Sequence, residues 1–148
     1  MTALSHIPVF QTSALAEHQL AQALPLVQMT WPEIDLSAWI DFAHGIWAEG
    51  GGLLALREPD DYICGVVAYR RQTSIEGRVL SVPLFTVADL ANREHLAQKL
   101  VEAIEQLGRQ LGCRVGHMEF NWRQSRLIDR LRRLGWPAES ALLERRWD

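Results

Sequence analysis

Apolar residues recur at helical spacing most clearly between Asn92 and Leu111. Five large apolar residues follow one another there at intervals of three or four positions: Leu96, Leu100, Ile104, Leu107 and Leu111. Charged and amide side chains occupy most of the positions between them. Such spacing gathers the apolar side chains on one face, as in an amphipathic helix that packs against a sheet. The pattern therefore predicts a helix over 92–111 that Gly112 ends.

Two more helices are predicted in the first third of the chain. The first covers Ser13–Met29, with Ser13 as its N-terminal cap and Pro25 as an expected break or kink. The second covers Leu36–Ala48, and three consecutive glycines at 50–52 end it. A short β-like segment, His6–Gln11, precedes both helices and is read as an edge strand. This part of the chain is therefore expected to be ordered β, α, α.

Mainly apolar segments between turn residues predict the strands. Three consecutive segments have this character: Leu53–Arg57, Tyr62–Arg71 and Arg78–Val87. Pro83 lies inside the third segment, and because proline cannot donate to a ladder it predicts a bulge or an end of pairing. After the long helix, the pattern predicts a strand, a helix and a last strand at Cys113–Phe120, Asn121–Arg133 and Ala141–Trp147. The order β, α, α, β, β, β, α, β, α, β is typical of an α/β or α+β domain with a mixed central sheet flanked by helices.

The composition fits one globular unit. The chain has 148 residues, of which 48% are hydrophobic and 22% charged, so we expect a single domain over 1–148. No run of about 18 apolar residues is present, and the N-terminus lacks the pattern of a secretory leader, so neither a membrane span nor secretion is expected. Cys64 and Cys113 stand apart in apolar surroundings and are read as reduced core thiols. These features predict a cytoplasmic protein.

The charges are unevenly distributed. Residues 1–108 hold 6 Lys/Arg and 13 Asp/Glu, whereas residues 109–148 hold 9 Arg and 5 Asp/Glu. The arginines of the last predicted helix, Arg123, Arg126, Arg130 and Arg133, recur at helical spacing and would contact solvent or an anionic ligand. The net charge of −3 and the acidic first two-thirds argue against nucleic acid as the partner.

The C-terminal region carries the resemblance to a known family. Met118–Gln124 forms the predicted passage from a strand into the last helix, and Arg126–Trp136 ends that helix with Leu-Gly-Trp. This resembles the fifth strand and last helix of the GNAT superfamily of N-acetyltransferases, whose last helix ends in Leu-Gly-aromatic. The resemblance implies a GNAT fold, acetyl-CoA as cofactor, and an amine on a small molecule or a protein as substrate. A second copy of the chain is a further candidate partner.

The same register implies where acetyl-CoA would bind. It assigns the cofactor to the end of the fourth strand, at Phe85 and Val87, and to the loop that opens the long helix, which comprises Asn92, Arg93, Glu94, His95, Leu96 and Ala97. The family's loop reads Gln/Arg-x-x-Gly-x-Gly/Ala. Here only Ala97 fits, because Asn92 stands for Gln/Arg and His95 for the first glycine.

These departures bear on phosphate binding. Glycine lets backbone N–H groups approach pyrophosphate oxygens closely, and His95 brings a Cβ and a ring to that position. Glu94 would stabilise the start of the helix, but its charge would oppose a phosphate, which Arg93 could partly offset. Two interpretations of 92–97 therefore stand side by side: a phosphate-binding loop, and a helix start capped by Asn92.

The catalytic groups that the resemblance implies are also changed. Leu131 stands where many family members carry a tyrosine acid, and the fourth strand lacks a carboxylate base. His117 and Glu119 are the candidate replacements, because residues two apart on a strand point to one face. They fit equally an exposed, hydrogen-bonded sheet face. His44 follows Asp41 by three, but no further ligand at a matching spacing is evident, so no metal is expected.

Two functions follow from these observations. The first is an acyl-CoA-dependent N-acyltransferase that transfers an acetyl group to an amine. The alternative is a GNAT-fold binding or assembly module that has lost CoA chemistry, which the missing glycine, tyrosine and glutamate favour. A fold does not by itself fix the function, so the site has to decide between the two.

Overall fold

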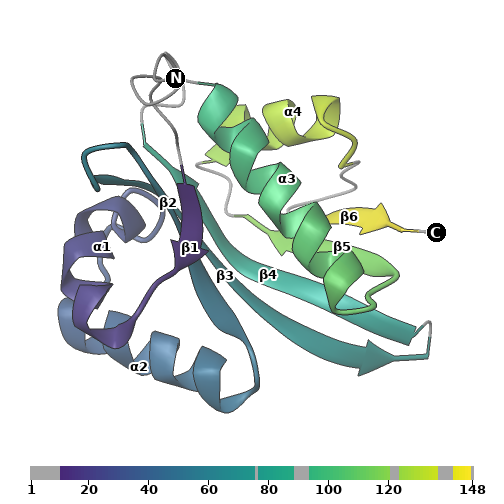
Figure 1. Cartoon of the computed structure of the whole chain (residues 1–148), viewed down its shortest axis with the longest axis horizontal. Coiled ribbons are helices and arrows are strands. Elements are labelled where there is room, and N and C mark those ends of the chain that lie inside the picture. Colours follow the sequence, from purple (N-terminus) through teal and green to yellow (C-terminus); the bar gives the residue numbers. More distant parts are fainter. Residues whose placement is uncertain (1–10, 76, 89–93, 121–123, 137–141, 148) are drawn as a thin grey trace, which may run out of the picture.

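Six strands form one mixed sheet, and their order in space follows their order in the sequence. The computed structural model describes residues 11–75, 77–88, 94–120, 124–136 and 142–147. The strands are β1 Gln11–Ala14, β2 Gly52–Arg57, β3 Ile63–Ser74, β4 Gly77–Val87, β5 Val115–Glu119 and β6 Leu142–Arg146. Neighbouring strands are antiparallel except β4 and β5, which are parallel. A helix connects these two, as a parallel crossover requires (Figure 1).

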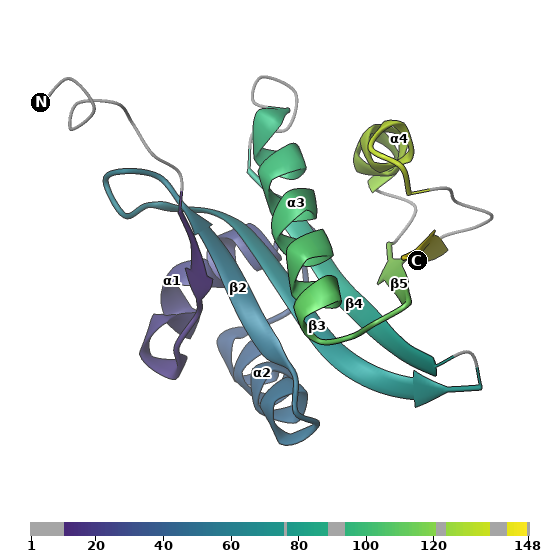
Figure 2. The same ribbon diagram turned by 45° about the vertical axis from the view of Figure 1, so that its right-hand side comes forward.

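The helices cover both faces of the sheet. They are α1 Leu20–Val27, α2 Leu36–Ala48, α3 His95–Gln110 and α4 Ser125–Arg133. The first two helices bury Ala23 and Trp39 in a core with β2 and β3, and the last two bury Leu100 and Leu131 in a second core on the opposite face. Figure 2 shows α3 and α4 on one side of the twisted sheet and α1 and α2 on the other. The sequence-based order of elements and fold class are confirmed.

The long helix packs as its pattern predicts. Leu96, Leu100 and Ile104 are fully buried against the sheet, and Leu107 and Leu111 are partly buried at its end. The described helix begins at His95, and Gly112 follows it with a φ of 72°, a conformation that glycine adopts without strain. The second helix, α2, has the predicted bounds, and the Asp35 side chain caps it by accepting from the N–H of Ala38 at 2.8 Å.

The first predicted helix is wrong at its start. Ser13 lies in β1, opposite Ala55 of β2, and a short 3₁₀ turn at Glu17–Gln19 precedes α1. Pairing with β2 therefore overrides the helical preference of this segment. Pro25 does not break α1, which continues for two more residues to Val27. The expected edge strand begins at Gln11 and ends at Ala14, and most of the segment predicted for it, His6–Gln11, lies outside the described residues.

The strand that contains Pro83 has both irregularities that proline predicts. Ala68 pairs with Leu84 and Arg70 pairs with Ser81, so Tyr69 alone lies opposite two residues of β4. This is a β-bulge. On the other edge of β4, pairing with β5 begins at Val79–Val115 and ends at Val82–Met118. The segment Pro83–Val87 therefore extends beyond its parallel partner.

Within the described residues, no helix is long and apolar enough to cross a membrane.

Candidate acyl-donor site

The parting of β4 from β5 leaves one edge of β4 unpaired. Residues Pro83–Val87, called here the β4 open edge, have no ladder partner in β5. Figure 2 shows β5 turning away from β4 at this end of the sheet. Buried backbone groups need hydrogen-bond partners, so an edge of this kind is suited to pair with an extended chain that carries amides.

The hydrogen-bond pattern shows which residues face that edge. In an antiparallel pair, residues that exchange hydrogen bonds alternate with residues that do not. The N–H of Ala88 donates to the carbonyl of Cys64 at 2.8 Å, which fixes the phase of the β3–β4 ladder. Phe85 and Val87 are therefore in the non-bonded class and direct their N–H and C=O groups away from β3. Their side chains are buried, so only their backbone is available to a ligand.

A side chain from α4 already contacts this edge. Gln124, the N-cap residue of α4, donates from Nε2 to the carbonyl oxygen of Phe85 at 3.0 Å. The same nitrogen lies 3.3 Å from the hydroxyl oxygen of Thr30, a buried residue in the segment between α1 and α2. The β4 open edge, α4 and the α1–α2 segment thus meet at Gln124.

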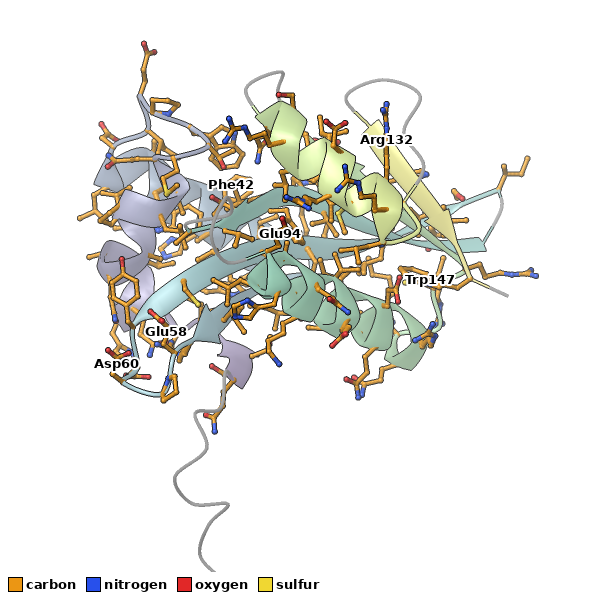
Figure 3. All side chains as sticks on the ribbon, turned by 90° about the horizontal axis from the view of Figure 1, so that it is seen from above. Phe42, Glu58, Asp60, Glu94, Arg132 and Trp147 are labelled. Carbon is orange, nitrogen blue, oxygen red and sulfur yellow. The ribbon has the colours of Figure 1, made fainter. Side chains whose placement is uncertain are left out.

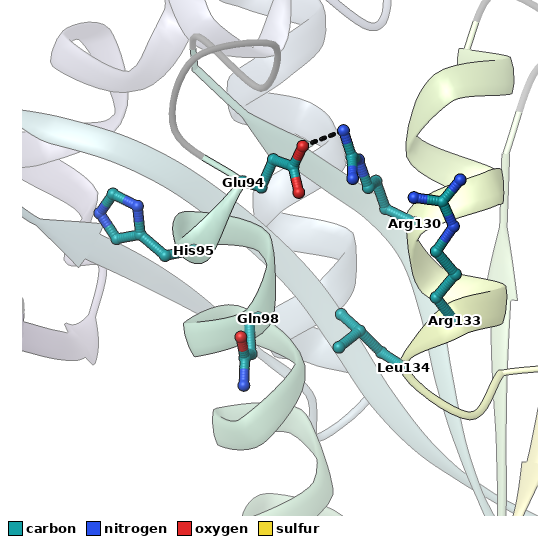
Figure 4. A pocket seen from close by; sticks show the side chains of 6 residues that line it. All are labelled: Glu94, His95, Gln98, Arg130, Arg133 and Leu134. Carbon is teal, nitrogen blue, oxygen red and sulfur yellow. Dashed lines mark ion pairs between the residues drawn. The ribbon is translucent and has the colours of Figure 1, made fainter.

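A pocket lies beside the start of α3. Its volume is about 320 Å³, and it is lined by Glu94, His95, Gln98, Arg130, Arg133 and Leu134. Figure 4 shows Glu94 and Arg130 pointing toward each other across it, from α3 and α4, and they form an ion pair. The first N–H groups of a helix have no intrahelical partner, so this end of α3 favours negative charge. Two arginines and a helix start therefore line one cavity. Figure 3 shows Glu94 at the start of α3, with α4 beside it.

The residues predicted for the loop 92–97 have different surroundings. Asn92 and Arg93 lie outside the described residues. Glu94 and His95 are exposed and line the pocket, whereas Leu96 and Ala97 point into the core. Leu96 and Ala97 could therefore meet a ligand only through their backbone. The N–H of Ala97 donates to the carbonyl of Glu94 at 3.1 Å, so it already has an acceptor within the helix start.

The Glu94–Arg130 pair changes the electrostatic argument about phosphate. The charge of Glu94 is balanced by an arginine on α4, a partner that the local sequence around 92–97 does not indicate. Arg133 lines the same pocket, and its side chain forms no ion pair with any described residue. An anion that enters would meet Arg133 directly and could take over Arg130 from Glu94.

The two candidate catalytic residues lie on the other face of the sheet. Gly116 and Met118 face α3 and α4, because a Cβ on Gly116 would contact Trp136 and Met118 lies in that core. His117 and Glu119 alternate with them and face the side of α1 and α2. His117 is partly buried and pairs in register with Ser81 of β4 and Glu144 of β6, and Glu119 is exposed at the end of β5. Neither lines the pocket at α3.

Leu131 is fully buried in the core between α4 and the sheet. It presents no polar group at the position where many members of the resembled family carry a tyrosine. Among the described residues, no group of three His, Cys, Asp or Glu side chains is placed to hold a metal ion. The ring Nε2 of His44 forms a hydrogen bond with the carboxylate of Glu17 on the exposed side of α2.

Sequence reasoning assigned no role to Gln124 or Thr30. Arg130 and Arg133 were anticipated only as members of an arginine face with solvent and anion as alternatives. Gln124 entered only as the last residue of the Met118–Gln124 passage into the last helix, and its contacts are with residues 39 and 94 positions away. Only the fold brings these groups together, so a local pattern could not reveal them.

Comparison with known proteins supports the architecture. No family model and no curated protein matches the sequence. Solved structures do match over nearly the whole chain. An aminoglycoside N-acetyltransferase in complex with CoA has a TM-score of 0.77 at 13% identity, with 91% of this chain and 92% of that chain covered. A GNAT-family acetyltransferase from Staphylococcus aureus also has a TM-score of 0.77, at 8% identity, with 95% and 100% covered.

A third similar structure is that of yncA from Salmonella typhimurium with its cofactor acetyl-CoA. Its TM-score is 0.74 at 11% identity, and 95% of each chain is covered. Identities this low establish shared architecture and no more. The chain has the fold of the GNAT acetyltransferases.

Proposed function

We propose that this chain is an acyl-CoA-dependent N-acyltransferase that transfers an acetyl group from acetyl-CoA to an amine. The observation that carries the proposal is the β4 open edge, which directs the backbone of Phe85 and Val87 away from β3. A pocket with two arginines at the start of α3 supports it. The unpaired backbone of β4 suits the amides of a pantetheine arm, and the two arginines suit phosphates. We further propose that one domain spans the whole chain.

The residues present fit this cofactor, which supplies an acyl group activated as a thioester. The backbone groups of Phe85 and Val87 would bind the pantetheine arm as an added strand. Arg130 and Arg133 would bind phosphate oxygens together with the first N–H groups of α3. Glu94 would then exchange its ion pair with Arg130 for contact with water, to which it is already half exposed.

The acceptor amine would approach from the face of the sheet that α1 and α2 cover. His117 and Glu119 point to that face, and we propose them as the groups that accept a proton from the amine. Both residues end near the point where β4 and β5 part, because Met118, which lies between them, forms the last pair of the ladder. The main contribution of the protein would be to hold donor and acceptor in the right orientation.

A small-molecule amine is the favoured acceptor. The similar structures include a second aminoglycoside acetyltransferase, from Acinetobacter baumannii, with a TM-score of 0.74 at 14% identity. Each of these names describes the other protein, and for this chain it supports an amine on a small molecule without identifying that molecule. A protein amine remains the alternative acceptor, and a second copy of the chain a candidate partner.

A thermal-shift titration with CoA, 3′-dephospho-CoA and pantetheine at low salt tests the proposal. At a ligand concentration 100 times the dissociation constant, CoA should add about 2.7 kcal/mol to the free energy of unfolding. Glu94→Gln should strengthen CoA binding because it releases Arg130, and Arg130→Gln should weaken it. Neither change should alter pantetheine binding, because pantetheine carries no phosphate to reach the pocket.

The matched control is Arg126→Gln, which removes an exposed arginine of α4 that does not line the pocket. It should leave the CoA response unchanged apart from a small long-range effect that salt screens. A flat response of the natural protein to millimolar CoA would contradict the acyltransferase and leave the binding or assembly module. If CoA binds, release of free thiol from acetyl-CoA in the presence of an amine then measures turnover.

A further inference from the structure

Gln124 connects the donor side of the sheet with the acceptor side. Its Nε2 reaches Phe85 on the β4 open edge and approaches Thr30 in the segment between α1 and α2. These two contacts are called here the Gln124 clasp. They join three parts of the chain, and 94 residues separate its two ends, Thr30 and Gln124.

The chemistry of the clasp resembles that of a bound amide. A glutamine side chain carries the same carboxamide group as a peptide or a pantetheine arm, and both donate N–H to a carbonyl. In the structure the carbonyl of Phe85 accepts from Gln124 at 3.0 Å, in a direction that points away from β3. A donor amide that pairs with β4 at Phe85 would therefore compete with Gln124 for one acceptor.

The other half of the clasp concerns the acceptor side. Thr30 is 6% exposed, and its hydroxyl oxygen is the group that Gln124 approaches. The segment that contains Thr30 follows α1, which packs on the face where His117 and Glu119 point. A change at Gln124 would therefore be transmitted to the face from which an amine approaches.

We propose that Gln124 is a positioning residue that holds the carbonyl of Phe85 until an acyl donor replaces it, and whose release loosens the α1–α2 segment at Thr30. This inference rests on the proposed function, because it takes the β4 open edge as the donor site. Gln124 leaves Phe85 when the donor amide arrives, and its second contact, to Thr30, is lost with it. Donor binding thus loosens the acceptor face at Thr30.

Pantetheine affinity tests the first half of the proposal. Gln124→Met keeps the length of the side chain but cannot donate, and Gln124→Glu keeps a polar N-cap residue but likewise cannot donate to a carbonyl. Both variants should bind pantetheine about three- to tenfold more tightly than the natural protein, the factor that the net contribution of one hydrogen bond gives. A merely structural role for Gln124 would leave this affinity unchanged or lower it.

Two further variants sharpen the measurement. Thr30→Val removes the hydroxyl that Gln124 approaches and should raise pantetheine affinity by a smaller factor than Gln124→Met. Gln22→Met, on the exposed side of α1, is the matched control and should change nothing. Because pantetheine lacks phosphates, phosphate binding at the Glu94–Arg130 pocket cannot contribute to the differences in affinity.

Hydrogen exchange tests the second half. In the natural protein, pantetheine should speed amide exchange in residues 28–35, and in Gln124→Met the same residues should exchange fast before any ligand is added. If exchange there is slow in both proteins, or pantetheine slows it in the natural protein, the proposed link to the acceptor face is wrong.

The outcomes separate this inference from the proposed function. If the natural protein binds pantetheine and both Gln124 variants bind it equally or more weakly, the clasp is overturned while the acyltransferase stands. If only the Gln124 variants bind, the clasp is supported and the natural protein is not the enzyme proposed. If no variant binds pantetheine or CoA, both ideas are overturned.

Discussion

Trp136 and Trp147 meet edge to face, with ring centroids 5.9 Å apart and ring planes at 82°. The two rings lie over glycines: a Cβ on Gly116 would come within 2.6 Å of Trp136, and one on Gly108 within 2.6 Å of Trp147. Both indoles are buried, and neither indole N–H finds an acceptor among the described residues. The pair therefore stabilises this end of the fold by apolar packing, which depends on the absence of two side chains beneath it.

Adding one methyl group under Trp147 should destabilise the protein. Gly108→Ala places a Cβ against three ring atoms of Trp147, at 2.6 to 3.2 Å, so the ring or α3 must shift. Overpacking of this kind costs about 1–3 kcal/mol. Urea denaturation followed by circular dichroism measures the free energy of unfolding.

The control for this change is another helical glycine. Gly45 of α2 has nothing within 4 Å of the position that a Cβ would take. Gly45→Ala should stabilise the protein by about 0.5–1 kcal/mol, because alanine loses less backbone entropy in a helix. Equal effects of the two substitutions would show that the contact between Gly108 and Trp147 is not as close as described.

Truncation of a buried leucine in α3 should be costly. Leu100 is fully buried between α3 and the sheet, where one of its methyl carbons would lie 2.6 Å from a Cβ on Gly65. Leu100→Ala should lower the free energy of unfolding by about 2–5 kcal/mol. Ile75→Ala, at a fully exposed position, should change it by less than about 0.5 kcal/mol. If Leu100→Ala lowers the free energy of unfolding by less than about 0.5 kcal/mol, the described packing of α3 on β3 is wrong.

The two cysteines should resist alkylation in the native protein. Cys64 and Cys113 are both buried and form no disulfide. Burial raises the pKa of the Cys113 thiol, and the charges of Arg71 and Arg78 oppose that rise in part. A raised pKa means less thiolate, so reaction with iodoacetamide at pH 7–8 should be slow and should accelerate as pH rises or as the protein unfolds.

The raised pKa of Cys113 also makes the free energy of unfolding depend on pH. The unfolded chain ionises Cys113 at a lower pH than the native protein does, so the free energy of unfolding should fall slightly as pH rises above the ordinary thiol pKa. Cys113→Ser should reduce this alkaline loss. Rapid labelling of Cys113 in the native protein at pH 7 would contradict the burial described.

Much of the fold was predictable from local pattern. The Leu96–Leu111 stripe identified α3 and its buried face because one helix period repeats there without interruption. The bounds of α2 were also predictable, since Asp35 caps one end and glycines follow the other. Pro83 indicated the irregular strand because the absence of a backbone N–H is a local property that no tertiary contact restores.

The features that the sequence did not reveal depend on contacts between distant residues. β1 has four exposed residues and no alternation of apolar and polar positions, so only its pairing with β2 makes it a strand. The balance of charge at Glu94 depends on Arg130, which is 36 positions away and on another helix. The contacts of Gln124 likewise join elements that no local pattern connects. Candidate site residues that depend on such partners need the fold before their chemistry can be judged.

The bulge opposite Tyr69 changes which positions of β4 face α3. Before it, the even-numbered Leu80 and Val82 face α3, and after it the odd-numbered Phe85 and Val87 do. Deleting a residue elsewhere in β4, with the bulge kept, would turn Phe85 and Val87 from the core under α3 toward the core under α1, and only removal of the bulge's extra residue would leave them facing α3. Replacing a residue at the bulge would cost only local packing. This strand can therefore vary in composition far more freely than in length.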